Sequence, residues 1–561
     1  MAGPNIPAAK RAGLPVDLER MALEGDGWLS ADDRYSLKTW GVCPQSQPHR
    51  FMVRVRVPGG VLPTDQARAL ARLGRRYGED WLHLTTRQSV ELHWVADRTV
   101  RDLLADLERV GLSTRSACGH TLRNVLCSED AGVALDEPFD CFPDARAASD
   151  AIVARSEELN GILPSRINLA FGGSPRCRED ALINDMAFVS TVVDGVAGYE
   201  VSAGGSLGKS PSLSVPLADF VPRVDVLAAC EALIDVFIAH GDLDTPSKGR
   251  LRFVVAALGA DGFRRAWSEA FAAARLRPHP EPVPVPVLDD ETQAAILRHR
   301  PVGGWSAGVR PQRTPGLASI TIDLPLGDTN GSELELIADL ADRYGDGALL
   351  LGRDQDVVLR NVAVADVDAV RQAIAPRGLT FAGEGPTASI RACTGSSVCA
   401  IGIAEAPDAG RMLLASPALR RNSSLRVHVS GCPNSCAQHQ AGDIGLAGSK
   451  VRIAGATRLG YHLFLGADLG RGRVGEVVGR VAADDVPAAV DAVVGVWEAV
   501  RRAGETLSHT VHRIGVDGFA ANLETVMAER WATGPEPEVA AAVASGTPSS
   551  ATPVALAGSA A

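Results

Sequence analysis

The chain contains an internal repeat, and this repeat restricts the possible folds more than any other feature of the sequence. Residues 54–95 align without a gap with residues 321–362, so that Gln88 matches Gln355 at a constant offset of 267 residues. A self-match of this length is the signature of a duplicated structural unit. We therefore predict two halves with the same fold, related by a pseudo-twofold axis.

Each copy of this repeat predicts a strand, a helix and a second strand. In the first copy, apolar residues alternate with polar ones over residues 51–57, which is the period of a half-buried strand. Ala67, Leu70 and Ala71 follow at helical spacing, and residues 82–95 again favour a strand.

A second unit also occurs twice, after each copy of the first. Its copies are residues 184–209 and 442–472, and each follows a predicted strand, at 163–173 and 424–432. The predicted fold class is α+β, in which each half consists of an α+β module followed by an α/β module. The predicted units are an N-terminal extension with the first α+β module (1–110), the first α/β module (111–274), a Pro-rich linker (275–300), the second α+β module (301–375), the second α/β module (376–534) and a disordered tail (535–561).

Four cysteines occur in the second half only: Cys393 and Cys399, then Cys432 and Cys436. Zinc knuckles use thiolate pairs two to four residues apart, so a pair with five intervening residues fits them poorly. On a helix beginning near Pro433, the second pair would place both sulfurs on one face. Four thiolates suit a [4Fe-4S] cluster, while a zinc site and ordinary buried cysteines stay open as alternatives.

Composition limits the partners of the chain. Of its 561 residues 46% are hydrophobic, but no apolar run is long enough to cross a bilayer, and the N-terminus has no apolar signal region. We therefore expect a cytoplasmic protein without a membrane partner, whose cysteines are thiols or ligands. The net charge of −11 argues against nucleic acid as a partner.

Several motifs together resemble those of one family. They are the segment SGCPNSCAQHQAGDIG at 430–445, the Cys393-x5-Cys399 pair, HLTTRQ at 83–88, RVRVPGG at 54–60 and RNVL at 123–126. In this order they are similar to the sirohaem-dependent nitrite and sulfite reductases, over about residues 35–520. The resemblance implies ferredoxin-like α+β modules, α/β modules that bind a [4Fe-4S] cluster and sirohaem, and six-electron reduction of nitrite to ammonia or sulfite to sulfide.

The resemblance also implies roles for individual residues. Cys436 falls at the cysteine that ligates the cluster and is the axial ligand of sirohaem iron, and such sharing joins the electron store to the substrate-binding iron. Arg54 and Arg123 fall at substrate-binding arginines, and Arg87 and Gln88 at sirohaem-contacting positions. Since sirohaem carries eight carboxylates, further polar and basic residues are expected around it. The candidates for these contacts are Arg56, Asn434, Lys209, Arg391, Arg426 and Arg471.

Two substrate positions depart from the usual pattern of the family. Sulfite reductases typically carry Lys-x-Lys there and nitrite reductases Lys-x-Asn, whereas this chain has Arg166 and Asn168. Asn168 favours nitrite. Arginine is a poorer proton donor than lysine, so we expect Arg166 to hold the anion while ordered water, relayed by Arg123, delivers protons.

Another departure concerns Cys43, because many relatives carry tyrosine at its position. In some relatives this tyrosine is joined to a cysteine that aligns with Cys118, and here the tyrosine partner is missing. We therefore expect no Tyr–Cys crosslink and two separate buried thiols. The other cysteines are expected to be packing residues: Cys127, Cys141, Cys177 and Cys230.

The same motifs leave other functions open. They are a sulfite-preferring reductase, a monooxygenase of cobalamin biosynthesis resembling precorrin-3B synthase, and a non-catalytic cluster protein. The glycine clusters at 203–208 and 466–472 do not open a nucleotide-binding βαβ unit. Electrons would therefore come from a separate donor, either a ferredoxin or a flavoprotein.

Overall fold

The two copies of the first repeat exchange a strand with each other. The computed structural model describes residues 3–298, 307–385, 388–453 and 455–533. Within them, β3 (Val61–Pro63) of the first copy pairs with β14 (Ala348–Leu351) of the second, and β13 (Asp328–Thr329) of the second pairs with β4 (Leu82–Leu84) of the first. Each copy thus completes the sheet of the other.

The resulting two sheets are antiparallel and have equivalent strand orders. The first is β1-β2-β5-β4-β13, with β1 (Val42–Pro44), β2 (Arg50–Val55) and β5 (Val90–Ala96). The second is β11-β12-β15-β14-β3, with β11 (Val309–Pro311), β12 (Leu317–Asp323), β15 (Val357–Ala363) and, paired with β12, β16 (Thr380–Phe381). Side-chain burial alternates along β2, as predicted, because one face of the strand packs on the core.

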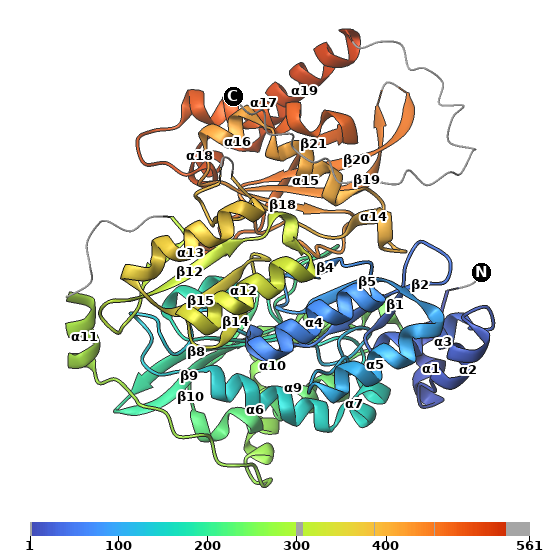
Figure 1. Cartoon of the computed structure of the whole chain (residues 1–561), viewed down its shortest axis with the longest axis vertical. Coiled ribbons are helices and arrows are strands. Elements are labelled where there is room, and N and C mark those ends of the chain that lie inside the picture. The colour runs from blue at the N-terminus through green and yellow to red at the C-terminus, as the bar shows by residue number, and fades with distance from the viewer. Residues whose placement is uncertain (1–2, 299–306, 386–387, 454, 534–561) are drawn as a thin grey trace.

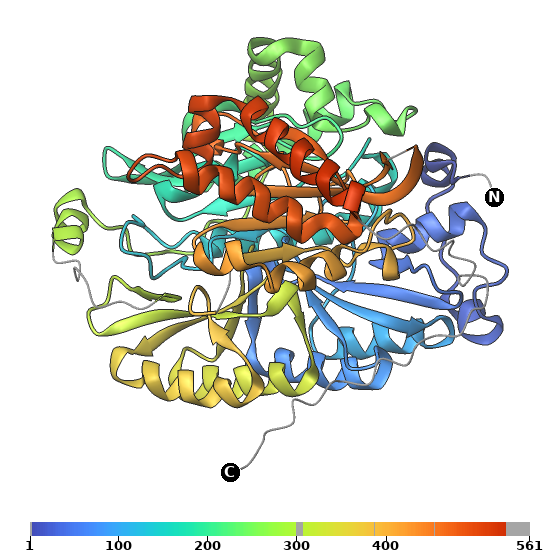
Figure 2. The same ribbon diagram turned by 90° about the horizontal axis from the view of Figure 1, so that it is seen from above.

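Helices from both copies cover the two sheets on one side. They are α4 (Thr64–Tyr77), α5 (Val100–Arg109), α12 (Gly331–Tyr344) and α13 (Val367–Ile374). Figures 1 and 2 show α4 and α12 side by side, and Arg68 of α4 binds Asp339 and Asp342 of α12 at 2.7 and 2.6 Å. One hydrophobic core includes residues of both copies, so neither can bury its apolar face alone.

Residues 82–95 form a hairpin, so the prediction of a single strand was wrong. The turn between β4 and β5 closes with Thr85 N–H donating to the Ser89 carbonyl at 3.0 Å, and Gln88 takes a positive φ of 53° that interrupts an extended strand. The equivalent turn between β14 and β15 carries Gln355 with a φ of 69°.

The α/β modules contain the other two sheets, and these also correspond strand by strand. The first has the order β10-β9-β8-β7-β6 and the second β17-β18-β19-β20-β21. In each, three strands are parallel and two antiparallel strands follow. The strands are β6 (Leu126–Cys127), β7 (Leu169–Gly172), β8 (Met186–Val193), β9 (Val196–Ala203), β10 (Val215–Pro222), β17 (Ser389–Ala392), β18 (Arg426–Ser430), β19 (Ile444–Ile453), β20 (Ala456–Leu465) and β21 (Glu476–Ala482).

The remaining helices lie around these modules and at the N-terminus. Figure 1 shows α17 and α19 at the opposite end of the molecule from α6 and α9. They are α1 (Ile6–Arg11), α2 (Leu18–Glu24), α3 (Ala31–Thr39), α6 (Phe142–Ala154), α7 (Ser156–Ile162), α8 (Arg178–Ala181), α9 (Val226–His240), α10 (Leu251–Ala274), α11 (Asp290–Arg298), α14 (Gly395–Val398), α15 (Ala406–Leu414), α16 (Pro417–Arg421), α17 (Val486–Val500), α18 (Leu507–Ile514) and α19 (Val516–Thr533). The predicted α+β class and its duplication are therefore confirmed. Helix α11 lies within the predicted linker, and the predicted disordered tail lies outside the described residues.

In the part of the chain that the structure describes, no helix combines the length and the apolar character that a membrane span requires.

Two equivalent glutamines connect the four sheets. The Gln88 amide donates to the carbonyls of Leu351 and Cys127 at 2.9 and 2.8 Å and accepts the Cys127 N–H at 2.9 Å. The Gln355 amide donates to the carbonyls of Leu84 and Ala392, both at 2.9 Å, and accepts the Ala392 N–H at 3.0 Å. Each glutamine thus joins its own turn to the opposite copy and to the first strand of an α/β module.

We predict that Gln355→Ala destabilises the protein by about 2 kcal/mol or more. The substitution leaves the buried N–H and carbonyl of Ala392 without their partner, and each such group costs about 1–3 kcal/mol. The measurement is the midpoint of urea unfolding, with exposed Gln372→Ala in α13 as the control. Equal midpoints for the two variants would contradict the role assigned to Gln355.

Candidate active site

A cavity that several of the predicted site residues line lies where the two glutamine turns face the α/β modules. Two adjoining pockets form it, and they share Leu126, Ile183, Asn184 and Gln438. One is lined by Arg87 of the first turn, and the other, of about 350 Å³, by Asp354 of the second turn. The two turns therefore contribute equivalent positions to opposite ends of one site.

The four cysteines lie where the parallel strands of the second α/β module end. Cys393 follows β17, Cys399 follows α14, and Cys432 and Cys436 lie in the loop after β18. This loop is not helical, so the predicted helix face was wrong. Ser435 and Gln438 have φ values of 60° and 59°, which turn the chain away from a helix.

The sulfurs of these cysteines influence one another. Burial, together with the neighbouring Cys436 and Cys399, raises the pKa of Cys432 to about 11. Burial and then Cys436 raise the pKa of Cys393, whose sulfur accepts the Gly431 N–H at 3.1 Å. Because these buried thiols resist ionisation, a metal cation that binds them would strongly stabilise their thiolate form.

The spacing of these sulfurs argues against one zinc ion. Zinc binds thiolates at about 2.3 Å, which holds tetrahedral sulfurs less than about 4 Å apart. Among the described residues, no three of these sulfurs lie within 4.8 Å of one another, whereas the group Asp26, His49 and Asp97 meets that limit. The wider arrangement fits a multi-iron cluster, whose potential also depends on N–H···S bonds such as that from Gly431.

Positive charge accumulates in the pocket next to Cys436. Arg87, Arg166 and Arg250 line it together with Asn168. The pKa of Arg166 is lowered first by the charge of Arg250 and then by burial, and the charges of Arg123 and Arg87 lower it further. Burial lowers the pKa of Arg87 to about 9. Among the described residues, no acidic group pairs with Arg166. These arginines repel one another and would be stabilised by a bound anion.

The Asn168 amide has a defined orientation in this pocket. Its nitrogen donates to Asp185 at 2.7 Å, and its oxygen accepts a hydrogen bond from Arg87. Asp185 is fully buried and also accepts from Arg250 at 3.1 Å. Because one amide hydrogen is committed to Asp185, the other is available for a ligand. Sequence reasoning missed Asp185 and Arg250, although Asp185 lies inside the second repeat.

The other end of the cavity is nearly balanced in charge. Arginines and acids line it in equal number: Arg310, Arg353, Arg391 and Arg426 with Glu129, Asp180, Asp354 and Asp356. Arg353 pairs with Asp180 at 2.8 Å, Arg391 pairs with Asp354, and burial raises the pKa of Asp356 to about 7. The excess of positive charge therefore lies near Arg166.

Buried donors in this cavity fit a carboxylate-rich tetrapyrrole. The Nε atoms of Arg310, Arg391 and Arg250 are buried without a hydrogen-bond partner among the described residues. Buried polar atoms rarely stay unpaired, so an anionic group that accepts from them would satisfy the site. Of the predicted contacts, Arg391, Arg426 and Asn434 line the cavity.

Arg54 and Arg123 lie beside this cavity and are held by protein groups. Arg54 forms an ion pair with buried Glu91, and Arg123 donates to the carbonyls of Ala117 and Gly119, the latter at 3.0 Å. The positive charge of Arg123 still acts on the cavity, because it contributes to the lowered pKa values of Arg87 and Arg166.

Other predicted cofactor contacts lie elsewhere. Buried Arg56 donates to the Leu122 carbonyl at 3.0 Å and to Ser149 at 3.2 Å, and Gln88 is committed to the backbone bonds described above. Both side chains thus have protein partners, and neither lines the cavity. Lys209 lies near Cys432, where its charge lowers the pKa of that thiol, and exposed Arg471 pairs with Asp468 at 3.6 Å.

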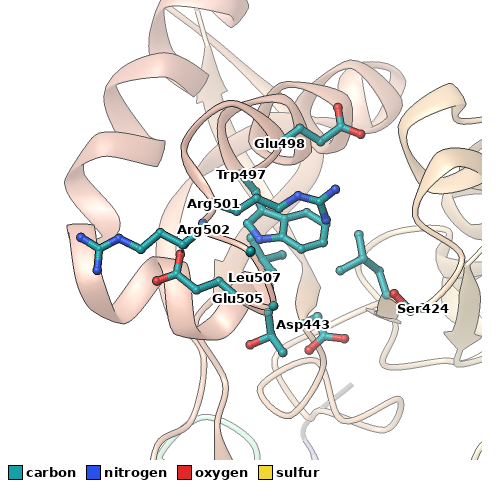
Figure 3. Close-up of a pocket in the computed structure, with 12 residues that line it drawn as sticks. Ser424, Asp443, Trp497, Glu498, Arg501, Arg502, Glu505 and Leu507 are labelled. Atoms are coloured by element: carbon teal, nitrogen blue, oxygen red, sulfur yellow. Dashed lines mark hydrogen bonds between the residues drawn. The ribbon is translucent and has the colours of Figure 1, made fainter.

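A separate pocket of about 620 Å³ lies at the end of α17, where Arg501 stacks 4.5 Å from the Trp497 ring (Figure 3). Its carboxylates are paired with arginines: Glu498 with Arg421, Glu505 with Arg513 and Asp443 with Arg426. None of the predicted site residues lines this pocket.

Comparisons with known proteins match nearly the whole described chain. Residues 118–274 and 387–530 match the nitrite and sulphite reductase 4Fe-4S domain, and residues 44–110 and 310–377 match the nitrite/sulfite reductase ferredoxin-like half domain. The ferredoxin–nitrite reductase of Synechococcus elongatus is 32% identical over 498 residues, which cover 85% of this chain and 93% of the relative.

Two further proteins are similar to this chain over most of its length. The assimilatory ferredoxin-dependent nitrite reductase of Haloferax mediterranei is 28% identical over 560 residues, covering 91% of each chain. The solved structure of the Mycobacterium tuberculosis NirA protein superposes with a TM-score of 0.77 at 25% identity, covering 92% of this chain and 98% of that one.

We predict that Cys399→Ala removes the iron of the cluster. Loss of one of four thiolates leaves an open iron site, so purified protein should contain less than about half the iron and acid-labile sulfide of the wild type. The control is Cys230→Ala, at a buried cysteine outside the cluster. Unchanged iron and sulfide in Cys399→Ala would show that Cys399 is no ligand.

Proposed function

The chain belongs to the nitrite and sulphite reductase family of oxidoreductases, and on this premise we propose that it reduces nitrite to ammonia. Family membership implies a [4Fe-4S] cluster and sirohaem. The main support for nitrite is the pocket in which Asn168, oriented by Asp185 and Arg87, lies beside Arg166 and Cys436. The relatives named above, which are called ferredoxin–nitrite reductases, favour the same substrate.

In this proposal the cysteines bind the cluster that carries electrons, and the arginines bind the substrate. Cys393, Cys399, Cys432 and Cys436 bind the cluster, and Cys436 also faces the pocket beside Asn168. When bound, sirohaem supplies the iron at which the anion is reduced, and the cluster supplies electrons one at a time. The donor is a ferredoxin, as in the names of the relatives.

Arg166 and its neighbouring arginines attract the negative charge of nitrite. The anion relieves the mutual repulsion of Arg166, Arg250 and Arg87, and Asn168 offers its free amide hydrogen to an oxygen. Each nitrite oxygen leaves as water and needs protons. Because arginine does not release its proton near neutral pH, these protons come from ordered water near Arg123.

Steady-state rates with nitrite and with sulfite, under reduced methyl viologen, test the substrate. We expect kcat/KM for nitrite to exceed that for sulfite. A preference for sulfite above tenfold would overturn the assignment to nitrite, and an absorption spectrum without chlorin bands in the red would overturn the assignment of sirohaem.

Arg166→Ala tests the role of the anion pocket, by which we mean the pocket lined by Arg87, Arg166, Asn168 and Arg250. A hydrogen bond to a charged group is worth about 1.5–3 kcal/mol, so we expect kcat/KM for nitrite to fall by about 10- to 100-fold. Arg166→Lys keeps the charge and should retain more activity. If Arg166→Lys lowered turnover while Arg166→Ala did not, anion binding by Arg166 would be wrong. The matched control is Arg471→Ala, at an exposed arginine outside the cavity.

A further inference from the structure

Two segments far apart in the sequence approach each other closely beside Arg54. Ser116 N–H donates to the Thr39 carbonyl at 2.8 Å, and Arg54 N–H donates to the Gly41 carbonyl at 2.9 Å. Gly41 has a φ of 79°, and a Cβ at this position would lie 2.5 Å from the Thr114 carbonyl oxygen. Only glycine permits this approach, which sets the end of α3 and the start of β1 against residues 114–118.

This approach sets the thiols of Cys43 and Cys118 close enough together for each to shift the pKa of the other. The prediction of two separate thiols was therefore wrong. Cys118 is 3% exposed, whereas Cys43 is half-buried. The sulfurs of a second buried pair, Cys127 and Cys141, lie 3.5 Å apart, but both residues are fully buried.

The charges around the first pair favour a thiolate at Cys118. The neighbouring Cys43 thiol lowers the pKa of Cys118, and the guanidinium groups of Arg54 and Arg123 lower it further. Burial opposes this shift, and Glu91, although negative, is paired with Arg54. On the Cys43 side, the cations are Lys38 and Arg54. A thiolate next to cations, with a second thiol in contact, is the arrangement of reactive cysteine pairs.

We propose that Cys43 and Cys118 are a redox modification site, at which a peroxide converts the two thiols into a reversible disulfide beside the anion pocket. The Cys118 thiolate attacks one peroxide oxygen, the O–O bond breaks, and Cys118 becomes a sulfenic acid. The departing hydroxide takes up a proton and leaves as water. The Cys43 sulfur then attacks the Cys118 sulfur, the S–O bond breaks, and a second water leaves with the Cys43 proton.

The balance of this reaction is complete. Two thiols lose two electrons in total, and one peroxide gains them and becomes two molecules of water. A peroxide suits the site because it is small enough to reach a thiolate that is almost buried. The disulfide also removes the thiolate charge next to Arg54 and Arg123, and so changes the field of the anion pocket.

Peptide mapping after hydrogen peroxide treatment tests the proposal in the cluster-loaded enzyme. We expect the treated protein to lose two titratable thiols and to yield one disulfide-linked peptide pair that joins Cys43 to Cys118. Dithiothreitol should restore both thiols. Neither measurement requires nitrite or activity, so the result is independent of the proposed function.

Variants separate the disulfide from general oxidation. In Cys43→Ser, oxidation should stop at a Cys118 sulfenic acid that dimedone traps, and in Cys118→Ser neither product should form. In the control Cys230→Ser the disulfide should form as in the wild type. A wild type with dimedone-trapped Cys118 and no linked peptide would overturn the proposal, as would a link that joins Cys127 to Cys141 alone.

Discussion

The buried amides of Gln88 and Gln355 connect the parts of this molecule. Each amide spans from its own turn to a backbone carbonyl of the opposite copy and to both backbone groups of one residue in an α/β module. A fully satisfied buried amide is rigid, because every alternative leaves several polar groups unpaired in the core. The two turns are therefore held in a defined position relative to all four sheets.

That position determines what reaches the cavity. Arg87 precedes one glutamine and Asp354 precedes the other, so equivalent positions place opposite charges at the two ends of the site. At the Asp354 end the charges are nearly balanced, whereas at the Arg87 end several arginines share the carboxylate of Asp185. A symmetric scaffold thus produces an asymmetric site, with the anion pocket next to Cys436.

Local sequence patterns predicted much of this arrangement. The repeat predicted the duplicated fold, the cysteine spacing favoured a cluster, and the motifs predicted a family that the comparisons confirmed. Two local predictions were wrong, a strand over 82–95 and a helix face for Cys432 and Cys436. In both segments a positive φ, imposed by buried hydrogen bonds or by the turns of a loop, overrides the local preference.

The sequence by itself determined which chemical groups are available: four thiolates in one half, basic motifs in the other, and a repeat that brings the halves together. Tertiary structure decided how they combine. Arg250 lines the pocket and Asp185 orients Asn168 there, whereas Arg56 donates to a buried carbonyl outside it. Cys43 lies beside Cys118. All these contacts join segments that are distant in the chain. A charge or a thiol acquires its reactivity from its neighbours, and only the packed fold supplies those neighbours.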